Sequence, residues 1–239
     1  MSRTIAIGDI HGCATALDRL LDEIQPTADD TLIGMGDYVD RGMETSRVLE
    51  ILIDLVASCR FIPLIGNHEI MMFKALQNER QLEYWFQYGG SSTVASYGGR
   101  VQNIPQHHLA FLSHCVRFYE TDEFFFVHAN YDPDVDLTQQ PDELLFWQHV
   151  TAYPPPLHYS GKTAIVGHTP QIDGHVCNLG HIRVIDTFCY GDQWLTAHDV
   201  DSGEIWQANN QGDFRMAELG EIQDVYERDS YNDDIGDYP

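Results

Sequence analysis

The segment over residues 36–42 is the feature that most constrains how this chain folds. It places Asp37, Asp40 and Arg41 between two glycines, directly after an apolar run over residues 31–35. An unpaired charge is costly to bury, so these side chains do not suit a hydrophobic core. Charged groups at the end of an apolar strand are instead typical of a loop that binds ions or ligands. The segment therefore predicts a buried strand that ends in a polar site.

Four other apolar runs also end in polar side chains that can bind metals. The runs cover residues 4–7, 61–65, 124–127 and 163–166. Ligand sites in α/β sheets lie beyond the carboxyl ends of the strands, so residues far apart in sequence can meet there. We expect one such edge to collect the following side chains: Asp9, His11, Asp37, Asn67, His128 and His168.

The order of the elements predicts an α/β layered fold. Apolar residues at helical spacing predict helices over residues 13–24, 48–56, 70–88, 104–115 and 143–150. Short strand-like segments with tight glycine turns then predict a β-meander over residues 176–179, 181–185, 194–200 and 204–208. We expect a single domain over residues 1–219, followed by an acidic C-terminal tail over residues 220–239.

Other parts of the sequence are less informative. Residues 89–99 contain two glycine pairs in a Ser/Thr-rich segment and do not predict an element, while the aromatic run over residues 84–86 is typical of core packing. The remaining eight histidines are expected at the surface or in satisfied core positions: His107, His108, His114, His149, His158, His175, His181 and His198.

Composition and charge exclude several classes of partner. The 37 Asp and Glu residues outnumber the 13 Lys and Arg residues, and the formal net charge is −24. Nucleic acids and anionic membranes both require a positive surface, so neither is expected as a main partner. The five cysteines form no CxxC pair, and neither a secretory leader nor a run long enough to span a membrane stands out. We therefore expect a soluble cytoplasmic protein.

The predicted ligand set favours two divalent transition-metal ions. Two carboxylates, one amide oxygen and three imidazoles suit Mn, Fe or Zn rather than Ca. Six ligands exceed what one catalytic ion takes, whereas two ions that share a carboxylate use all six. Such a site remains positive and attracts a phosphate group even on an acidic protein. Paired ions also lower the pKa of a bridging water, which can then attack phosphorus in line.

Three side chains next to the predicted ligands have properties suited to phosphate chemistry. His68 follows Asn67 directly, and Asp40 can hold its imidazole in the protonated and correctly aimed form. The guanidinium of Arg41 can bind two phosphate oxygens at once. We expect His68, Asp40 and Arg41 to be catalytic, and we expect Arg41, Asn67 and His68 to contact the substrate phosphate.

Three sequence motifs resemble the signature blocks of the phosphoprotein phosphatase family, within the calcineurin-like metallophosphoesterases. The motifs are Gly-Asp-Ile-His-Gly at residues 8–12, Gly-Asp-Tyr-Val-Asp-Arg-Gly at residues 36–42 and Gly-Asn-His-Glu at residues 66–69. The segments around His128 and His168 are similar to the two later histidine positions of the small bacterial form. The family includes serine/threonine phosphatases and symmetrical diadenosine tetraphosphatases.

The resemblance implies a central β-sandwich flanked by helices, with the site at the carboxyl ends of the strands. By this likeness, one metal would be held by Asp9, His11 and Asp37, and the other by Asp37, Asn67, His128 and His168. His68 with Asp40 would be the general acid, and Arg41 would bind phosphate.

The sequence departs from the family pattern at two positions. Asn130 follows His128-Ala129, where the family usually has Gly. A second phosphate-binding Arg usually follows a Leu-Leu-Trp segment, but here Trp147 is followed by Gln148 and His149. Arg100 and Arg183 are the candidate replacements, and the alternative is a weaker clamp on the phosphate oxygens.

Taken together, the motifs predict a dinuclear metal-dependent phosphomonoesterase. A protein phosphatase acting on phosphoserine, phosphothreonine or phosphotyrosine is the expected type, with Mn²⁺ the metal expected to support activity in vitro. One alternative is a pyrophosphohydrolase of dinucleoside polyphosphates, although no basic cluster suited to a long polyphosphate is evident. Another is a metal-containing phosphate-binding protein with weak or no turnover. The sequence does not indicate an oligomeric state.

Overall fold

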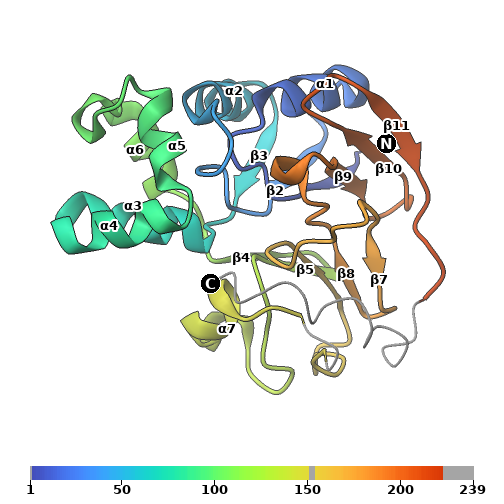
Figure 1. The fold of residues 1–239 in the computed structure, drawn as a ribbon. Coiled ribbons are helices and arrows are strands. Elements are labelled where there is room, and N and C mark those ends of the chain that lie inside the picture. Colours follow the sequence, from blue (N-terminus) through green and yellow to red (C-terminus); the bar gives the residue numbers. More distant parts are fainter. Residues whose placement is uncertain (1, 151–153, 223–239) are drawn as a thin grey trace.

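The computed structural model describes residues 2–150 and 154–222, and its centre is a pair of β-sheets (Figure 1). The first sheet has the order β11-β10-β9-β1-β2-β3, and the second has the order β4-β5-β6-β8-β7. The strands of the first sheet are β1 (Thr4–Ile7), β2 (Thr31–Gly34), β3 (Arg60–Pro63), β9 (Leu195–Asp199), β10 (Ile205–Ala208) and β11 (Phe214–Ala217). The strands of the second sheet are β4 (Phe118–Glu120), β5 (Phe124–Val127), β6 (Thr163–Val166), β7 (Cys177–Asn178) and β8 (Ile182–Val184).

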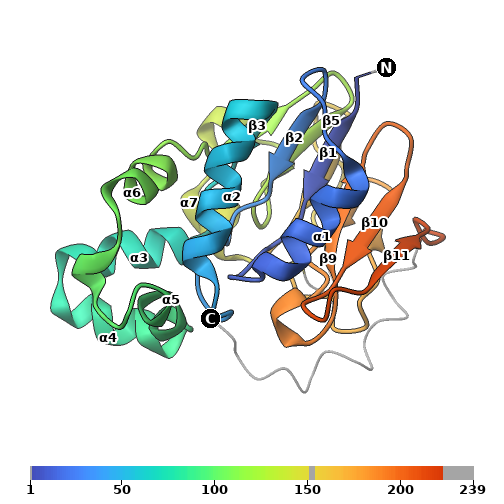
Figure 2. The same ribbon diagram turned by 90° about the horizontal axis from the view of Figure 1, so that it is seen from above.

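Helices flank both sheets. The α-helices are α1 (Ala14–Ile24), α2 (Thr45–Ser58), α3 (Asn67–Gln77), α4 (Glu79–Gln87), α5 (Gly90–Ser96), α6 (Gln106–Ser113) and α7 (Asp142–Trp147). Three short 3₁₀-helices are η1 (Val101–Asn103), η2 (Leu137–Gln139) and η3 (Cys189–Gly191). Figures 1 and 2 show α1 and α2 on the outer face of the first sheet and α3 to α6 beside the sandwich. No helix in the described part of the chain is long and apolar enough to cross a membrane.

The alternation of side chains along the strands creates the layers. In β1, Ile5 and Ile7 join the apolar cluster that contains Leu17 of α1, whereas Ala6 joins the cluster that contains Phe126 and Ile165 of the second sheet. In β5 of the second sheet, Phe125 and Val127 likewise join the cluster that contains Leu145 of α7. The central strands therefore pack against helices on one face and against the other sheet on the other face. The predicted β-sandwich flanked by helices is confirmed.

The strand directions bring the predicted site residues to one edge. β1, β2 and β3 are mutually parallel, and so are β5, β6 and β8. Pro63 is tolerated because β3 is an edge strand of the first sheet. Parallel neighbours end on the same side, so each sheet contributes several strand ends to the site.

Several sequence-based boundaries need correction. The helix predicted over residues 70–88 is two helices, because Asn78 interrupts it and caps α4 by accepting a hydrogen bond from Arg80 N (3.0 Å). The unassigned segment contains α5, and β4 and β11 were not predicted. The predicted meander is divided, since β7 and β8 join the second sheet while β9 and β10 join the first. Most of the predicted acidic tail lies outside the described residues.

Asp30→Asn is expected to lower the free energy of unfolding by about 1–2 kcal/mol near pH 7, because Asp30 is a buried hydrogen-bond hub at the start of β2. Its carboxylate accepts hydrogen bonds from the backbone N, Nε and Nη2 of Arg3 and from Thr27 N and Oγ1. The Arg3 guanidinium holds the pKa of Asp30 well below its usual range.

A carboxyl group whose pKa is lowered by folding stabilises the protein above the pKa of the unfolded chain, about 3.9. The difference between wild type and variant should therefore be full at pH 6–7 and shrink as the pH falls below about 4. Urea denaturation of both proteins across this pH range measures the difference in free energy of unfolding. A difference that grows at low pH would contradict the stabilising role of the Asp30 carboxylate.

Candidate active site

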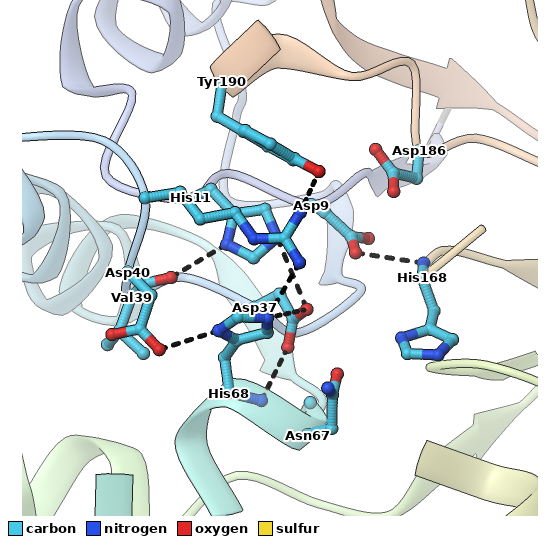
Figure 3. Close-up of polar contacts among 12 residues, drawn as sticks. Asp9, His11, Asp37, Val39, Asp40, Asn67, His68, His168, Asp186 and Tyr190 are labelled. Atoms are coloured by element: carbon cyan, nitrogen blue, oxygen red, sulfur yellow. Dashed lines mark hydrogen bonds and ion pairs between the residues drawn. The ribbon is translucent and has the colours of Figure 1, made fainter. Parts of the chain in front are cut away.

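Asp37 lies at the centre of a buried cluster of metal-ligating side chains (Figure 3). Two groups of three side chains have ligand atoms within 4.8 Å of one another, and Asp37 belongs to both. The first group adds His11 and His68, and the second adds His128 and His168. Asp37 Oδ2 lies 3.5 Å from His11 Nε2, and its Oδ1 lies 3.5 Å from His128 Nε2. The two carboxylate oxygens thus face two different halves of the cluster.

Each half of the cluster comes from the ends of parallel strands. Asp9 follows β1 and Asp37 follows β2, while Asn67 begins α3 shortly after β3. His128 follows β5 and His168 follows β6 in the second sheet. The six side chains predicted as ligands therefore meet at one edge of the sandwich, as the sequence analysis expects.

The three histidines of the predicted ligand set each donate one ring N–H to a backbone carbonyl. The donor–acceptor pairs are His11 Nδ1 to Val39 O (2.9 Å), His128 Nδ1 to Met35 O (2.8 Å) and His168 Nε2 to Trp147 O (3.1 Å). A carbonyl oxygen only accepts, so the other nitrogen of each neutral ring carries a lone pair. Burial lowers the pKa of all three rings, which favours the neutral form. This arrangement is typical of metal-ligating imidazoles.

Asn67 and His128 bring two acceptors together. Asn67 Oδ1 lies 3.0 Å from His128 Nε2. The proton of the His128 ring is on Nδ1, which donates to Met35 O. The lone pairs of Oδ1 and Nε2 therefore face each other, and a cation bound between them would turn this repulsion into attraction.

Asp9 is a further side chain whose surroundings suit a bound cation. Its Oδ2 accepts a hydrogen bond from His168 N (3.0 Å), but its buried Oδ1 has no hydrogen-bond partner among the described residues. Burial and the nearby carboxylates of Asp186 and Asp37 raise the pKa of Asp9 well above its usual range. A Cβ at Gly167 would overlap Asp9 Oδ1, so the glycine leaves this oxygen room. The residues present fit divalent metal ions.

The Asp40 carboxylate fixes the His68 ring. Asp40 Oδ2 accepts hydrogen bonds from His68 Nδ1 (2.7 Å) and Trp85 Nε1 (2.7 Å), and Oδ1 accepts one from Thr93 Oγ1 (2.7 Å). Burial raises the pKa of Asp40 to about 7, whereas burial and the Arg41 charge lower the pKa of His68. The neutral ring is therefore favoured, with its Nε2 lone pair towards Arg41. A protonated ring was expected from the sequence.

The Arg41 guanidinium lies between His68 and an aromatic ring that the sequence analysis missed. Arg41 Nη1 donates to Tyr190 Oη, Nη2 lies 3.3 Å from His68 Nε2, and Cζ lies 4.3 Å from the Tyr190 ring centroid. The Tyr190 ring also packs edge-on against His11, with centroids 4.8 Å apart (Figure 3). Arg41 N donates to Gly89 O (3.2 Å), which fixes the backbone as well. The guanidinium is thus held beside the cluster.

Glu69 connects the two loops that carry these groups. Its fully buried carboxylate accepts four backbone hydrogen bonds, from the N atoms of Asp37 (2.9 Å), Tyr38 (2.8 Å), Val39 (3.2 Å) and Gly66 (2.9 Å). Backbone donors in a tight loop need buried acceptors, which Glu69 provides. The loop after β2 is therefore fixed to the start of α3.

Backbone strain concentrates at the site. Positive φ angles occur at eight described residues other than glycine, and five of these belong to the predicted site: His11, Asp37, Asp40, Arg41 and His168. Such conformations cost about 1–3 kcal/mol each and persist only where the surroundings impose them. The strain supports a functional role for this edge of the sheets.

The side chains that meet here were named from the sequence, but the residues that support them were not. Trp85 and Thr93 bind Asp40, although residues 84–86 were interpreted as core packing alone and residues 89–99 were not assigned. Trp85 was the available signal, because a buried tryptophan usually donates its ring N–H to an acceptor. Asp186, close to Asp9, was not among the predicted site residues (Figure 3).

Neither candidate replacement for the second arginine lies at this site. Arg183 NH1 contacts His198 Nε2 (2.9 Å), and Arg183 lines a cavity with Thr163, at the opposite end of β6 from His168. Arg100 is exposed at the start of η1. His149, near the expected arginine position, instead stacks on His168 with ring centroids 4.5 Å apart.

The chain is similar in sequence to known phosphatases and tetraphosphatases. A segment of 85 residues is 36% identical to serine/threonine-protein phosphatase 2 of Salmonella typhimurium and covers 35% of this chain and 37% of that protein. The asymmetrical bis(5'-nucleosyl)-tetraphosphatase PrpE of Oceanobacillus iheyensis is 25% identical over 83% of this chain and 89% of its own length.

Solved structures share the fold. A cold-active protein-tyrosine phosphatase of a psychrophilic Shewanella species superposes with a TM-score of 0.66 at 13% identity, covering 90% of this chain and 80% of that chain. The family model described as calcineurin-like phosphoesterase matches residues 2–209, which includes every predicted site residue. Together with the paired Asp and His groups, this match shows that the chain belongs to the calcineurin-like phosphoesterase family.

Proposed function

We propose that this protein is a dinuclear metal-dependent phosphomonoesterase of the protein phosphatase type. The observation that supports this most directly is the pair of metal-ligating groups that share Asp37, with the Asp40–His68 pair and Arg41 beside them. Relatives named as protein phosphatases agree with this substrate class.

In this proposal the six buried side chains would hold two divalent ions. Asp9, His11 and Asp37 would bind one ion, and Asp37, Asn67, His128 and His168 would bind the other. When bound, the ions would lower the pKa of a coordinated water and neutralise charge on the phosphoryl oxygens. Mn²⁺, Fe and Zn²⁺ all suit these donors.

The chain's own residues would position the phosphate and supply a proton. Arg41 is held by Tyr190 and can turn its free donor atoms towards phosphate oxygens, as can the side chain of Asn67. A phosphate dianion next to His68 would draw Arg41 away from Nε2 and favour a proton there. Asp40 stabilises the resulting imidazolium through Nδ1, so Nε2 can donate a proton to the leaving alkoxide.

A second candidate function is hydrolysis of dinucleoside polyphosphates. The supporting observation is the similarity to the Oceanobacillus tetraphosphatase, which extends over most of both chains. Among the residues that the structure describes, Arg41 contacts the cluster, whereas Arg100 and Arg183 lie elsewhere. A long polyphosphate would need more positive groups, so we favour the phosphomonoester.

We also propose that residues 1–219 act as one catalytic domain in the cytoplasm. The cysteine count is odd and the sequence holds no CxxC pair, which fits a reducing compartment.

A substrate panel tests the proposed function. With Mn²⁺, we expect hydrolysis of para-nitrophenyl phosphate, and kcat/KM for phosphopeptides should exceed that for diadenosine tetraphosphate by about 10-fold or more. Asp9→Asn should lose the activity. Faster hydrolysis of the dinucleotide, followed by product chromatography, would instead support the second candidate. Tight phosphate binding without turnover under any metal would contradict an enzymatic role.

A further inference from the structure

A third group of metal-ligating side chains lies outside the active site, where α2 contacts α6. Glu50 of α2 and His107 and His108 of α6 have ligand atoms within 4.8 Å of one another. His107 Nε2 lies 3.1 Å from Glu50 Oε1, and His108 Nε2 lies 2.9 Å from the same oxygen. Two imidazoles thus converge on one carboxylate oxygen.

The spacing of these atoms is close to that of a tetrahedral zinc site. Zn²⁺ binds imidazole nitrogen and carboxylate oxygen at about 2.0–2.2 Å, which separates neighbouring ligand atoms by about 3.3 Å. The two contacts to Glu50 Oε1 differ from this value by only a few tenths of an ångström. Glu50 is exposed, so it can rotate to admit the ion.

The surroundings of His108 would support its role as a ligand. Its side chain is buried, and Nδ1 lies 2.6 Å from Tyr97 OH at the end of α5. If the proton of the neutral ring sits on Nδ1, it donates to the Tyr97 oxygen and leaves the Nε2 lone pair for a metal. Glu50 and His107 are each 56% exposed, so an ion and a water ligand can reach the group from solvent.

We propose that Glu50, His107 and His108 form a zinc site, with water as the fourth ligand, that ties α2 to α6. Two nitrogens and one oxygen are a donor set that Zn²⁺ prefers over Ca²⁺ or Mg²⁺. The net charge of −24 also favours cation binding. The site is separate from the Asp37 cluster, so it does not depend on the proposed catalytic function.

The zinc site would stabilise the helices that support Asp40. Tyr97 links His108 to the end of α5, and α5 carries Thr93, which binds Asp40. α2 begins shortly after Arg41. Bound zinc would therefore stabilise the position of α2, which follows the loop that carries Asp40 and Arg41, and of α5, which contacts Asp40.

Zinc stoichiometry tests the proposal on the full chain without a polyhistidine tag. After equilibrium dialysis against buffered Zn²⁺, we expect Glu50→Gln and His107→Ala each to bind one ion fewer per chain than wild type. Both positions are exposed, so neither change should prevent folding. His114→Ala, an exposed histidine change at the end of the same helix, should bind as much zinc as wild type. Equal stoichiometry in all four proteins, or the same loss in His114→Ala, would overturn the site.

A thermal measurement tests the tie between the helices. Zn²⁺ should raise the midpoint of unfolding less in His107→Ala than in His114→Ala, because ions at the active site stabilise both variants equally. An identical Zn²⁺-dependent rise in the two variants would overturn the proposed tie.

Discussion

Asp37→Asn is expected to remove metal from both halves of the site and to lower kcat/KM by about 10³-fold or more. The two carboxylate oxygens of Asp37 face His11 and His128, in the two groups that it joins. An amide offers one neutral oxygen and one N–H₂ donor, so it cannot bind a cation on both sides. Metal content after dialysis and phosphatase kinetics measure the loss.

Two variants serve as controls for Asp37→Asn. Asp22→Asn removes an exposed carboxylate of α1 and should change neither metal content nor activity. Arg41→Ala should retain the metal but weaken inhibition by inorganic phosphate and raise KM, because Arg41 contacts His68 and Tyr190 rather than the proposed metal ligands. Full metal content in Asp37→Asn, or metal loss in Arg41→Ala, would contradict the assigned roles.

Glu69→Ala is expected to lower the free energy of unfolding by about 4 kcal/mol, the largest loss of stability that we predict for a single side chain. Its carboxylate accepts four backbone hydrogen bonds in a fully buried position, and alanine would leave all four donors without an acceptor. Denaturant unfolding of the metal-free protein measures the effect without a contribution from bound ions.

Glu69→Gln tests whether the loss of stability in Glu69→Ala comes from the lost side-chain volume or from the lost hydrogen-bond acceptors. The amide has nearly the same size, but its N–H₂ group would face backbone N–H donors, so the variant should also be clearly destabilised. Glu79→Ala, at an exposed position in the first turn of α4, should change stability by less than about 0.5 kcal/mol. A Glu69→Gln protein as stable as wild type would contradict the role of the four hydrogen bonds.

The proposed metal ligands could be predicted from the sequence because each is marked by a local pattern, an apolar strand that ends in polar side chains. Each proposed metal ligand lies within a few residues of an apolar strand, and the parallel pairing of those strands follows from the alternation with helices. The helix that was predicted as one element failed at Asn78, because a polar cap overrode a continuous apolar pattern.

The supports of the site could not be predicted because their contacts join distant parts of the chain. Trp85 contacts Asp40 across 45 residues, and Tyr190 contacts Arg41 across 149 residues. Neither residue belongs to a periodic pattern that indicates its partner. The division of the last strands between two sheets also depends on long-range pairing, because short strands with glycine turns suit either sheet.

The origin of the ligands in two different sheets has a mechanical consequence. Asp37 is carried by the first sheet, whereas His128 and His168 are carried by the second, so an ion bound to all three would join the two layers of the sandwich. The distance between those layers is set by the apolar side chains between them, including Phe126 and Ile165. Metal affinity would therefore depend on the distance between the two sheets. A substitution that changes the volume of a side chain between the sheets would alter metal affinity, although that side chain contacts no metal ligand.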